Sequence, residues 1–418
     1  MNVLLVGSGG REHALAWKIS QSAALTRLYT APGNPGTATL GHNLPIDATD
    51  LAGLLAAIHQ HAIDLVVVGP EAALAAGLVD ACQAAGVLAF GPTAAAAQIE
   101  SSKAFAKTVM QAAGVPTANA FSFDDPQQAA AFVRERGQIW VVKVDGLAGG
   151  KGVIVPESLE QTLAAVAQLG STSAGTRLLL EQKLSGPEVS VIALCDGERL
   201  WAFPPAQDHK RLLDGDRGPN TGGMGAFAPS PLVDRALLNE IVTTTMAPVV
   251  RELARRGIPF RGALFAGIML TEAGPSVLEF NARFGDPETQ ALMPLTEGDL
   301  LLALHECAQG KLRPDLLHWR EGAAACIVLA AAGYPEAPRT GDMISGIAGV
   351  QDGGVVFQAG TALHDGQLHT AGGRVLGVVG AGPTPAGAIE LAYTAAAPIS
   401  FDGMHYRTDI GRTREKTA

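Results

Sequence analysis

Polar and apolar side chains alternate through the stretch Val277-Leu278-Glu279-Phe280-Asn281-Ala282-Arg283-Phe284-Gly285-Asp286-Pro287-Glu288, until Gly285 and Pro287 end the pattern. This alternation is typical of a half-buried β-strand, in which every second side chain lies on the same face. We expect the polar face to carry Glu279, Asn281 and Arg283. The core face then carries Leu278, Phe280 and Ala282.

The polar face combines side chains that suit phosphate chemistry. The carboxylate of Glu279 and the amide oxygen of Asn281 are hard oxygen ligands of the kind Mg²⁺ prefers, and this ion completes its octahedron with phosphate oxygens and water. The guanidinium of Arg283 can neutralise a phosphoryl group during transfer. A half-exposed edge strand with a surface ion pair would contain the same residues, so this stretch alone leaves both interpretations open.

The composition indicates a globular chain of several compact units. Its 418 residues are 47% apolar and 17% charged, which suffices for two to four units and excludes a disordered protein. The formal net charge of −10 argues against non-specific binding of nucleic acid, although a local cluster of Lys and Arg can still hold a small polyanion. We therefore expect no nucleic-acid partner.

No membrane segment and no cysteine framework is indicated. The longest apolar run, near residues 323–333, is too short to cross a bilayer, and no basic leader precedes the apolar residues at 3–6. The cysteines lack the spacing of a zinc or disulfide framework and are expected to be small buried side chains: Cys82, Cys195, Cys307 and Cys326. We expect a soluble, cytoplasmic protein without a membrane partner.

The first hundred residues alternate strand and helix patterns. Glycine turns follow apolar strands at residues 7–10, 69–71 and 91–92, and helices are expected at residues 11–20 and at about 72–85. Strands that alternate with helices form a parallel sheet, whose ligands bind beyond the carboxyl ends of the strands. We therefore expect a parallel α/β domain with its glycine turns gathered at one edge.

The first glycine turn indicates a phosphate site in preference to a dinucleotide site. The dinucleotide fingerprint needs a third glycine at position 12, where this chain has Glu12, and no acid ends the second strand. Amide groups at Gly9 and Gly10, beside Arg11, can hold a phosphate at the start of a helix, although such a turn is often only a tight connection. His13 lies on this helix and is expected to be structural or solvent-facing.

A single lysine interrupts the apolar strand at residues 140–144. Because an unpaired buried ammonium is costly, Lys143 is expected to hold a ligand phosphate. The glycine-rich residues 145–153 carry Lys151 and are predicted to fold over a triphosphate as a lid, with a flexible surface hairpin as the alternative. They form no Walker A loop, because Gly152 stands where that motif has Ser or Thr.

Acidic and glycine-rich segments follow. Glu181 ends an apolar strand and Glu188 follows a Ser-Gly-Pro turn, so either carboxylate can hold ribose hydroxyls or an adenine amine, or be a solvated strand end. The later segments at residues 207–211 and 218–226 combine charge and glycine with few apolar residues, which is typical of binding loops.

Together these motifs resemble the ATP-grasp superfamily and, within it, the phosphoribosylamine–glycine ligase family over essentially the whole chain. The motifs that carry the resemblance are Gly7-Ser8-Gly9-Gly10-Arg11-Glu12-His13-Ala14, Ala31-Pro32-Gly33-Asn34, Val68-Gly69-Pro70-Glu71, residues 143–153, Gln207-Asp208-His209-Lys210-Arg211, Asn220-Thr221-Gly222-Gly223-Met224-Gly225 and Glu279 through Gln290. The last three are specific to that family. Ser101 and Gly149 stand where the family often has Gly and Ala, exchanges that would at most alter loop mobility.

The resemblance implies an ATP-dependent, ADP-forming ligase of purine biosynthesis. ATP would phosphorylate the carboxylate of glycine, the amine of 5-phosphoribosylamine would attack the glycyl phosphate, and glycinamide ribonucleotide, ADP and phosphate would leave. Such phosphoryl transfer needs positioning and charge neutralisation more than a covalent nucleophile. Mg²⁺ or Mn²⁺ is the implied ion.

The resemblance also implies roles for individual residues. The catalytic set is Arg283, Lys143 and Asp208. Nucleotide contacts are assigned to Lys103, Lys143, Lys151, Glu181 and Glu188, and the metal ion to Glu279 and Asn281. Phosphoribosylamine is assigned to Gly9, Gly10, Arg11, Asn34 and Glu71, and the ammonium of glycine to Asp208 and Asp286.

The implied fold is multidomain, of the α/β and α+β classes. It comprises an N-terminal parallel α/β domain (1–101), a central ATP-grasp domain (102–320) with a lid subdomain near 120–190, and a small β-rich C-terminal domain (321–418). In the C-terminal domain we expect strands at 324–329, 355–358 and 374–379 and a helix at 385–395. Arg374 follows a glycine turn, either at a phosphate or at the surface. We expect a monomer.

Two other functions remain open. A different ATP-grasp ligase would keep the nucleotide residues and differ only in the loops for the amine and the acid. A non-catalytic nucleotide-binding regulator would need no acid site, and the joint presence of Lys143, Glu279, Asn281 and Arg283 counts against it.

Overall fold

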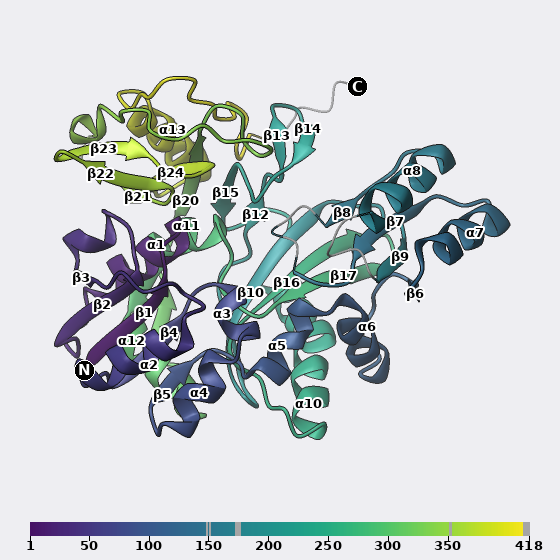
Figure 1. Ribbon diagram of the computed structural model, residues 1–418, viewed down its shortest axis with the longest axis horizontal. Coiled ribbons are helices and arrows are strands. Elements are labelled where there is room, and N and C mark those ends of the chain that lie inside the picture. The colour runs from purple at the N-terminus through teal and green to yellow at the C-terminus, as the bar shows by residue number, and fades with distance from the viewer. Residues whose placement is uncertain (148, 150–151, 172–176, 351–352, 413–418) are drawn as a thin grey trace.

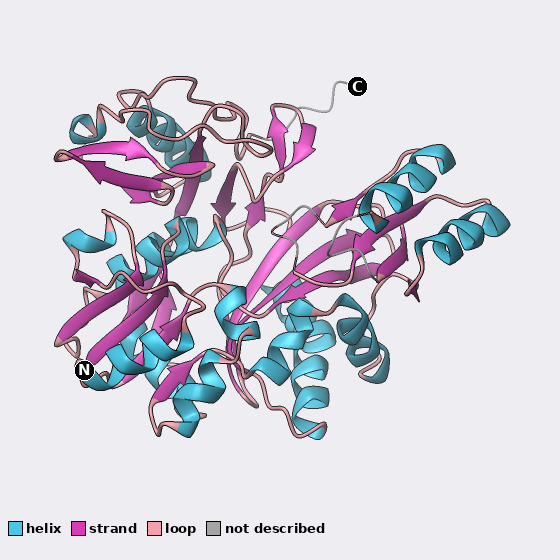
Figure 2. Cartoon of the chain, in the orientation of Figure 1, coloured by secondary structure: helices cyan, strands magenta, loops and turns pink. Residues whose placement is uncertain are grey.

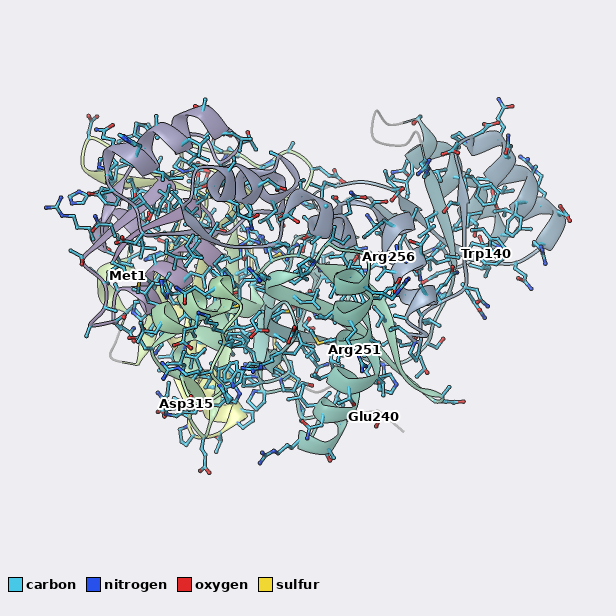
Figure 3. All side chains as sticks on the ribbon, turned by 90° about the horizontal axis from the view of Figure 1, so that it is seen from below. Met1, Trp140, Glu240, Arg251, Arg256 and Asp315 are labelled. Carbon is cyan, nitrogen blue, oxygen red and sulfur yellow. The ribbon has the colours of Figure 1, made fainter. Side chains whose placement is uncertain are left out.

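The computed structural model describes residues 1–147, 149, 152–171, 177–350 and 353–412. The chain forms an N-terminal α/β domain, a central antiparallel sheet with a lid that extends to one side, and a C-terminal sheet (Figures 1 and 2). Met1 and Trp140 mark the N-terminal domain and the lid at opposite ends of the molecule (Figure 3). Within the described residues, no helix is both long enough and apolar enough to cross a membrane.

The N-terminal domain contains a five-stranded parallel sheet in the order β3-β2-β1-β4-β5. Its strands are β1 (Asn2–Gly7), β2 (Arg27–Pro32), β3 (His42–Asn43), β4 (Leu65–Val68) and β5 (Leu88–Phe90). Its helices are α1 (Gly10–Ile19), a 3₁₀ turn (Thr37–Thr39), α2 (Leu51–Gln60), α3 (Glu71–Ala75), α4 (Leu78–Ala84) and α5 (Ala94–Ser101). The strands are almost continuously buried, as expected for a parallel sheet covered on both faces. The predicted parallel α/β domain is confirmed.

The helix expected at about residues 72–85 is wrong as a single element. Gly77 adopts a left-handed conformation with φ of +86° and separates α3 from α4. Only glycine adopts this backbone freely, so Gly77 turns the chain between the two helices. Helix α3 therefore spans only Glu71–Ala75 and begins directly after the glycine turn that ends β4.

The lid has a small core of its own. Its antiparallel sheet runs in the order β6-β9-β7-β8. Its elements are β6 (Ala120–Phe123), α7 (Pro126–Arg136), β7 (Trp140–Val144), β8 (Val153–Ile154), α8 (Leu159–Gly170) and β9 (Leu178–Gln182). Val133 on α7 and Val166 on α8 pack with Val142 on β7 to close this core.

The central domain is built on an antiparallel sheet in the order β11-β10-β16-β17. Its strands are β10 (Glu188–Asp196), β11 (Leu200–Ala202), β16 (Arg261–Thr271) and β17 (Gly274–Asn281), with short pairs β13 (Arg211–Leu213) with β14 (Arg217–Asn220), and β18 (Thr296–Gly298) with β19 (Leu317–Trp319). Its helices are α6 (Lys103–Ala112), α9 (Arg235–Ile241), a π turn (Val242–Met246), α10 (Ala247–Arg255), α11 (Glu288–Leu292), a 3₁₀ turn (Met293–Leu295) and α12 (Leu300–Gln309).

Strand β17 departs from strict alternation at one residue. Glu279 pairs with Gly267 and Val277 pairs with Ile268, so Leu278 is the extra residue of a bulge. Val277 and Phe280 are fully or almost fully buried in the core, whereas Leu278 is half-buried. The expectation that Leu278 shares the core face is therefore wrong. The bulge leaves the carbonyl of Leu278 out of the strand pairing and available to a side chain.

The C-terminal sheet is antiparallel in the order β12-β15-β20-β24-β21. Its strands are β12 (Gln207–Asp208), β15 (Gly225–Ala228), β20 (Ala323–Ala330), β21 (Gly354–Gln358) and β24 (Arg374–Gly382), with a hairpin of β22 (Thr361–His364) and β23 (Gln367–Thr370), a 3₁₀ turn (Ile347–Gly349) and helix α13 (Pro385–Ala396). The antiparallel β-rich region is confirmed. Because β12 and β15 join it from the middle of the chain, this sheet is assembled across the expected boundary near residue 320.

Candidate active site

Two lysines share one buried carboxylate beside the lid. Glu181 on β9 accepts ion pairs from Lys143 on β7, at 2.9 Å, and from Lys107 on α6, at 3.4 Å. Lys143 also donates to the carbonyl of Leu278, at 3.2 Å, which the bulge of β17 leaves free. The ammonium of Lys143 is thus paired inside the protein, and its expected contact with a ligand phosphate stays a prediction. Glu181 holds the lysine in reach of β17.

Lys107 was not singled out from the sequence, although it is one of the most confined cations of the chain. Its ammonium donates to the Thr117 hydroxyl, at 2.7 Å, and to the Ala118 carbonyl, at 3.0 Å. Burial lowers the pKa of Lys107 to about 8, against the opposing charge of Glu181. Thr117 in turn donates to the carbonyl of Val277, so Lys107 ties the entry to the lid to β17.

Lys103 lies at the start of α6 and faces the glycine-rich segment. Its ammonium donates to the carbonyl of Gly146, at 3.0 Å. Asp145 accepts from the Ala104 backbone amide and the Ser102 hydroxyl, both at 3.1 Å, which anchors that segment to the helix start. Burial lowers the pKa of Lys103, although Glu279 opposes this effect. The predicted lid residue Lys151 lies outside the described residues.

Glu279 lies where the cations converge. Burial alone would raise the pKa of its carboxyl, but the charges of Lys210, Lys143, Lys103 and Arg283 outweigh burial, and the net pKa is lowered. The carboxylate is therefore ionised at neutral pH. Asn281, two residues further along β17, presents its amide oxygen to Arg283 Nη2 at 3.3 Å.

The donor set of β17 fits a hard divalent ion. Among the described residues, no cluster of three or more His, Cys, Asp or Glu side chains is arranged to hold a metal by itself. Glu279 and Asn281 supply two oxygen atoms, and Mg²⁺ commonly takes the remainder of its octahedron from phosphates and water. The site therefore suits an ion that arrives with a nucleotide.

Arg283 follows β17 and joins two carboxylates of the N-terminal domain to the site. Its Nε lies 3.3 Å from Glu71 and its Nη2 lies 3.1 Å from Glu100. Although burial acts to lower the pKa of Arg283, Glu100 and Glu71 raise it, so the guanidinium stays charged. Glu100 also accepts from the backbone amide of Ala282, at 2.7 Å. It was missed because it ends α5, where the sequence offers no motif around it.

A second cluster of ionisable side chains surrounds Lys210. Lys210 forms a close ion pair with Glu188 on β10, and it lies beside Asp208 on β12. Burial raises the pKa of Asp208 to about 8, and the charges of Glu288, Glu188 and Glu279 act in the same direction. Lys210 and Glu288 lie in the quoted motifs but had no assigned role. Ser190 donates to Glu288 at 3.1 Å and fixes that carboxylate at the start of α11.

A cavity of about 220 Å³ adjoins this cluster between the N-terminal and C-terminal sheets. Its lining residues are Ser8, Gly9, Asp286, Gln290, Val328, Ala359, Gly360, Arg374, Leu376 and Gly377. Asp286 accepts from Arg374 Nη2, at 3.0 Å, and from Gln290 Nε2, at 2.7 Å. Arg374, which the sequence left open between a phosphate and the surface, thus lies in the wall of the cavity.

Gly10 also faces this wall. A methyl group on Gly10 would lie 2.7 Å from Gln290 Nε2, so a larger residue would displace the amide that holds Asp286. Gly9 and Gly10 therefore let the glycine turn approach the loop that carries Asp286.

Three expected phosphoribosylamine residues are engaged within the protein. The Gly9 amide donates to Glu12, at 2.7 Å, and its expected contact with a phosphate stays a prediction. Arg11 donates to Glu12, at 2.6 Å, and to the carbonyl of Phe284, at 3.2 Å. Asn34 donates to the carbonyls of Ser8, at 2.8 Å, and Gln358, at 2.9 Å. Arg11 and Asn34 therefore hold the walls of the cavity together.

His13 is structural, as expected. Its Nδ1 accepts from the backbone amide of Gln358, at 2.8 Å, and its ring packs edge-on against Phe357. Burial lowers the pKa of His13 to about 4, so the ring is neutral at physiological pH. His13 and Asn34 thereby grip the two backbone groups of Gln358, next to the cavity residue Ala359.

Three family models match the chain in succession. They describe the N domain of phosphoribosylglycinamide synthetase (residues 1–100), its ATP-grasp (A) domain (101–289) and its C domain (324–413). Among curated proteins, the phosphoribosylamine–glycine ligases of Ralstonia nicotianae and Caulobacter vibrioides are 47% and 48% identical to this chain. Each alignment covers 98% of this chain, and 99% and 98% of the respective relative.

Solved structures agree with these matches. The phosphoribosylamine–glycine ligase of Thermotoga maritima superposes with a TM-score of 0.87 at 33% identity, covering 98% of this chain and all of that one. The biotin carboxylase domain of the Hydrogenobacter thermophilus 2-oxoglutarate carboxylase superposes with a TM-score of 0.73 at 16% identity, covering 97% of this chain and 91% of that one, which is a likeness of fold alone.

Proposed function

The chain belongs to the phosphoribosylglycinamide synthetase family, and from this premise we propose how its site joins glycine to 5-phosphoribosylamine. It is an ATP-dependent ligase of purine biosynthesis, like its named relatives. The product of such a ligation is glycinamide ribonucleotide, released with ADP and phosphate. The roles of individual residues below are proposals.

The observation that supports the assignment is one short loop, residues 281–286, that has candidate site residues at both ends. Asn281 ends the strand that faces the cations, Arg283 follows it, and Asp286 lies in the wall of the cavity. A ligase that activates an acid with ATP and then transfers it to an amine needs two adjoining sites. Residues 281–286 connect two such sites without an intervening element.

ATP transfers its phosphoryl group to the carboxylate of glycine in a site lined by two lysines and one arginine. Lys103 and Lys143 bind the phosphates, and the pairing of Lys143 with Glu181 fixes its position. Glu279 and Asn281 hold the divalent ion, which we propose to be Mg²⁺, with Mn²⁺ as a substitute of similar ligand preference. When bound, the ion neutralises charge on the phosphates.

The acceptor carboxylate belongs to glycine. Asp208 and Asp286 bind its ammonium group, and Arg283 neutralises the glycyl phosphate that forms. Glu71 and Glu100 keep the guanidinium of Arg283 in place through their ion pairs. Glu181 and Glu188 lie on the nucleotide side and contact adenine or ribose, and Lys151 contacts the triphosphate from the lid.

The amine substrate occupies the cavity. Gly9 and Gly10 contact phosphoribosylamine directly, and Arg374 adds a cation for its phosphate. Arg11, Asn34 and Glu71 support this site from the N-terminal domain. We propose that the enzyme acts as a monomer.

The test is ADP release by the purified protein with ATP, Mg²⁺, glycine and freshly generated phosphoribosylamine, with each component omitted in turn. We expect release only when all four are present. Release with a different acid or amine, and none with these, would overturn the substrates. ATP binding without release under any combination would favour a non-catalytic regulator.

A further inference from the structure

Arg407 is the largest of the almost fully buried side chains described, with 1% of its surface exposed. Its Nε and Nη2 donate to the two carboxylate oxygens of Asp409, at 2.7 and 2.8 Å. Its Nη1 donates to the carbonyl of Arg211, at 3.1 Å, and to the carboxylate of Asp216, at 2.9 Å. Two of these contacts therefore join the segment 405–410 to the β13–β14 hairpin, almost 200 residues earlier in the chain, and the other two hold the guanidinium against Asp409 of its own segment.

Neighbouring residues of the same segment reinforce this connection. Thr408 donates through its backbone amide, at 2.8 Å, and through its hydroxyl to the carboxylate of Asp214. The backbone amide of Gly215 donates to Asp409, at 2.8 Å, and a ring nitrogen of His405 lies 3.0 Å from the carbonyl of Leu212. Asp214, Gly215 and Leu212 all lie between the ends of the hairpin.

Both ends of this hairpin enter the candidate active site. Lys210 precedes it and pairs with Glu188, and the carbonyl of Lys210 accepts from the amide and hydroxyl of Thr221, which follows the hairpin. The next residue, Gly222, presents its carbonyl to the cavity residue Arg374. The hairpin is thus the outer part of a loop. The two ends of this loop, Lys210 and Thr221, are hydrogen-bonded to each other and lie between Glu188 and the cavity residue Arg374.

The segment around β12 also relates Arg407 to Asp208. Successive side chains of an extended segment point to opposite sides, so His209 lies opposite to Asp208 and Lys210. Burial lowers the pKa of His209 to about 4, and the charge of Arg407 acts in the same direction. Arg407 itself donates to the carbonyl of Arg211, the residue that directly follows Lys210.

We propose that Arg407 is a positioning residue for the ligation reaction. It locks the β13–β14 hairpin and thereby fixes Asp208 and Lys210, although it touches no substrate itself. A buried charge pair adds little net stability compared with apolar packing, but it does select one arrangement of the groups that it joins. This inference rests on the proposed function of Asp208 as a glycine-binding residue.

The test compares the whole enzyme with three variants. Arg407→Ala removes all four donor contacts. Asp216→Asn removes only the charge of an exposed partner with φ of +54°, a conformation that Asn also adopts. Arg339→Ala is the matched control, because Arg339 makes exposed ion pairs with Asp342 and Asp402 in the same domain.

For Arg407→Ala we expect kcat to fall about 10- to 100-fold and the KM for glycine to rise about 10-fold, since a misplaced group of about 1 Å has effects of this size. The KM for phosphoribosylamine should stay within about twofold, since its cavity lies on the other side of Asp286. Asp216→Asn should shift kcat and the glycine KM in the same direction by a smaller factor. Arg339→Ala should match the wild type.

A merely structural role predicts something else. Partial unfolding would reduce the amount of active enzyme and leave both KM values unchanged, and that result would overturn the proposal. If Arg407→Ala does not fold, Asp216→Asn decides: an unchanged glycine KM and kcat in a variant with unchanged Tm would also overturn it.

Limited trypsin digestion tests, without measuring turnover, whether Arg407 holds the β13–β14 hairpin in place. The hairpin contains the cleavage sites after Arg211 and Arg217, and we expect faster cleavage there in the Arg407 and Asp216 variants than in the Arg339 control. Unchanged cleavage would overturn the proposal that Arg407 fixes the hairpin. A wild type that fails to ligate glycine would instead reject the proposed function, whatever the digestion shows.

Discussion

Arg374 and Asp286 lie 88 residues apart in the chain and form an ion pair of 3.0 Å in the wall of the cavity. Arg374 belongs to β24 of the C-terminal sheet, whereas Asp286 belongs to the loop that follows β17. The guanidinium also donates to the carbonyls of Asp286 and Gly222. This contact closes the cavity between parts of the chain that have no common secondary structure.

Replacing Arg374 by Ala should weaken binding of phosphoribosylamine. A hydrogen bond to a charged group contributes about 1.5–3 kcal/mol, so we expect the KM for this substrate to rise about 10- to 100-fold. Steady-state kinetics with glycine and ATP saturating would measure it. Arg313→Ala, which breaks an exposed ion pair with Glu306, is the control, and an unchanged KM in Arg374→Ala would remove this residue from the substrate site.

Replacing Glu279 by Gln should abolish Mg²⁺-dependent turnover without unfolding the chain. The substitution keeps the shape of the side chain and removes the charge that a divalent ion needs, so we expect kcat to fall about 100-fold or more. ADP release and thermal unfolding would be compared with those of Glu272→Gln, an exposed residue of the turn between β16 and β17. Near-normal turnover in the Glu279 variant would sink the metal assignment.

Replacing Glu100 by Gln should lower kcat through Arg283. The amide can still accept from the backbone of Ala282, but the ion pair of 3.1 Å with Arg283 is lost. Because Glu71 remains as a partner, we expect a fall of about 10-fold, and a small loss of stability of about 1–3 kcal/mol. Kinetics and urea denaturation would measure both, with exposed Glu240→Gln as the control. Wild-type kcat would show that Glu71 alone positions the guanidinium.

The stability of the protein should depend on pH through His13. The folded-state pKa of His13, about 4, lies below the ordinary histidine value of 6.5, so between these values the unfolded chain binds a proton that the folded chain does not. The free energy of unfolding therefore falls as the pH decreases through this window, by about 3 kcal/mol for this group.

His13→Gln should remove this component of the pH dependence. The amide oxygen of Gln can accept from Gln358, as Nδ1 does now, but it does not titrate. Denaturant unfolding between pH 7 and pH 4.5 would be compared with that of His364→Gln, an exposed residue of β22. An equal pH dependence in wild type and His13→Gln would contradict the prediction.

Local patterns predicted much of the fold. The strand at residues 140–144 begins and ends as expected, and the strands and the helix of the C-terminal region lie within three residues of their expected ends. The exceptions are equally local in cause. Gly77 divides the expected helix at 72–85, and the bulge at Leu278 moves that side chain off the core face.

The sequence predicted which residues belong to the candidate site better than it predicted which of them pair with one another. Lys143 and Glu181 were assigned to different parts of the nucleotide, and the structure shows them 2.9 Å apart. Glu100, Lys107 and Arg407 were not singled out, because no spacing distinguishes a buried charge that pairs with a distant partner from a solvated one. Their identification required the distances between elements.

The sequence by itself determined the strands, the glycine turns and the family, because periodicity, backbone freedom and motif spacing are properties of neighbouring residues. Only the tertiary structure decided which charges neutralise one another and where the cavity lies. His13 meets Gln358 across 345 residues and Arg407 meets Asp216 across 191, and such contacts arise only when burial brings distant segments together. The buried charges then pair with the partners that folding supplies, since leaving them unpaired would be costly.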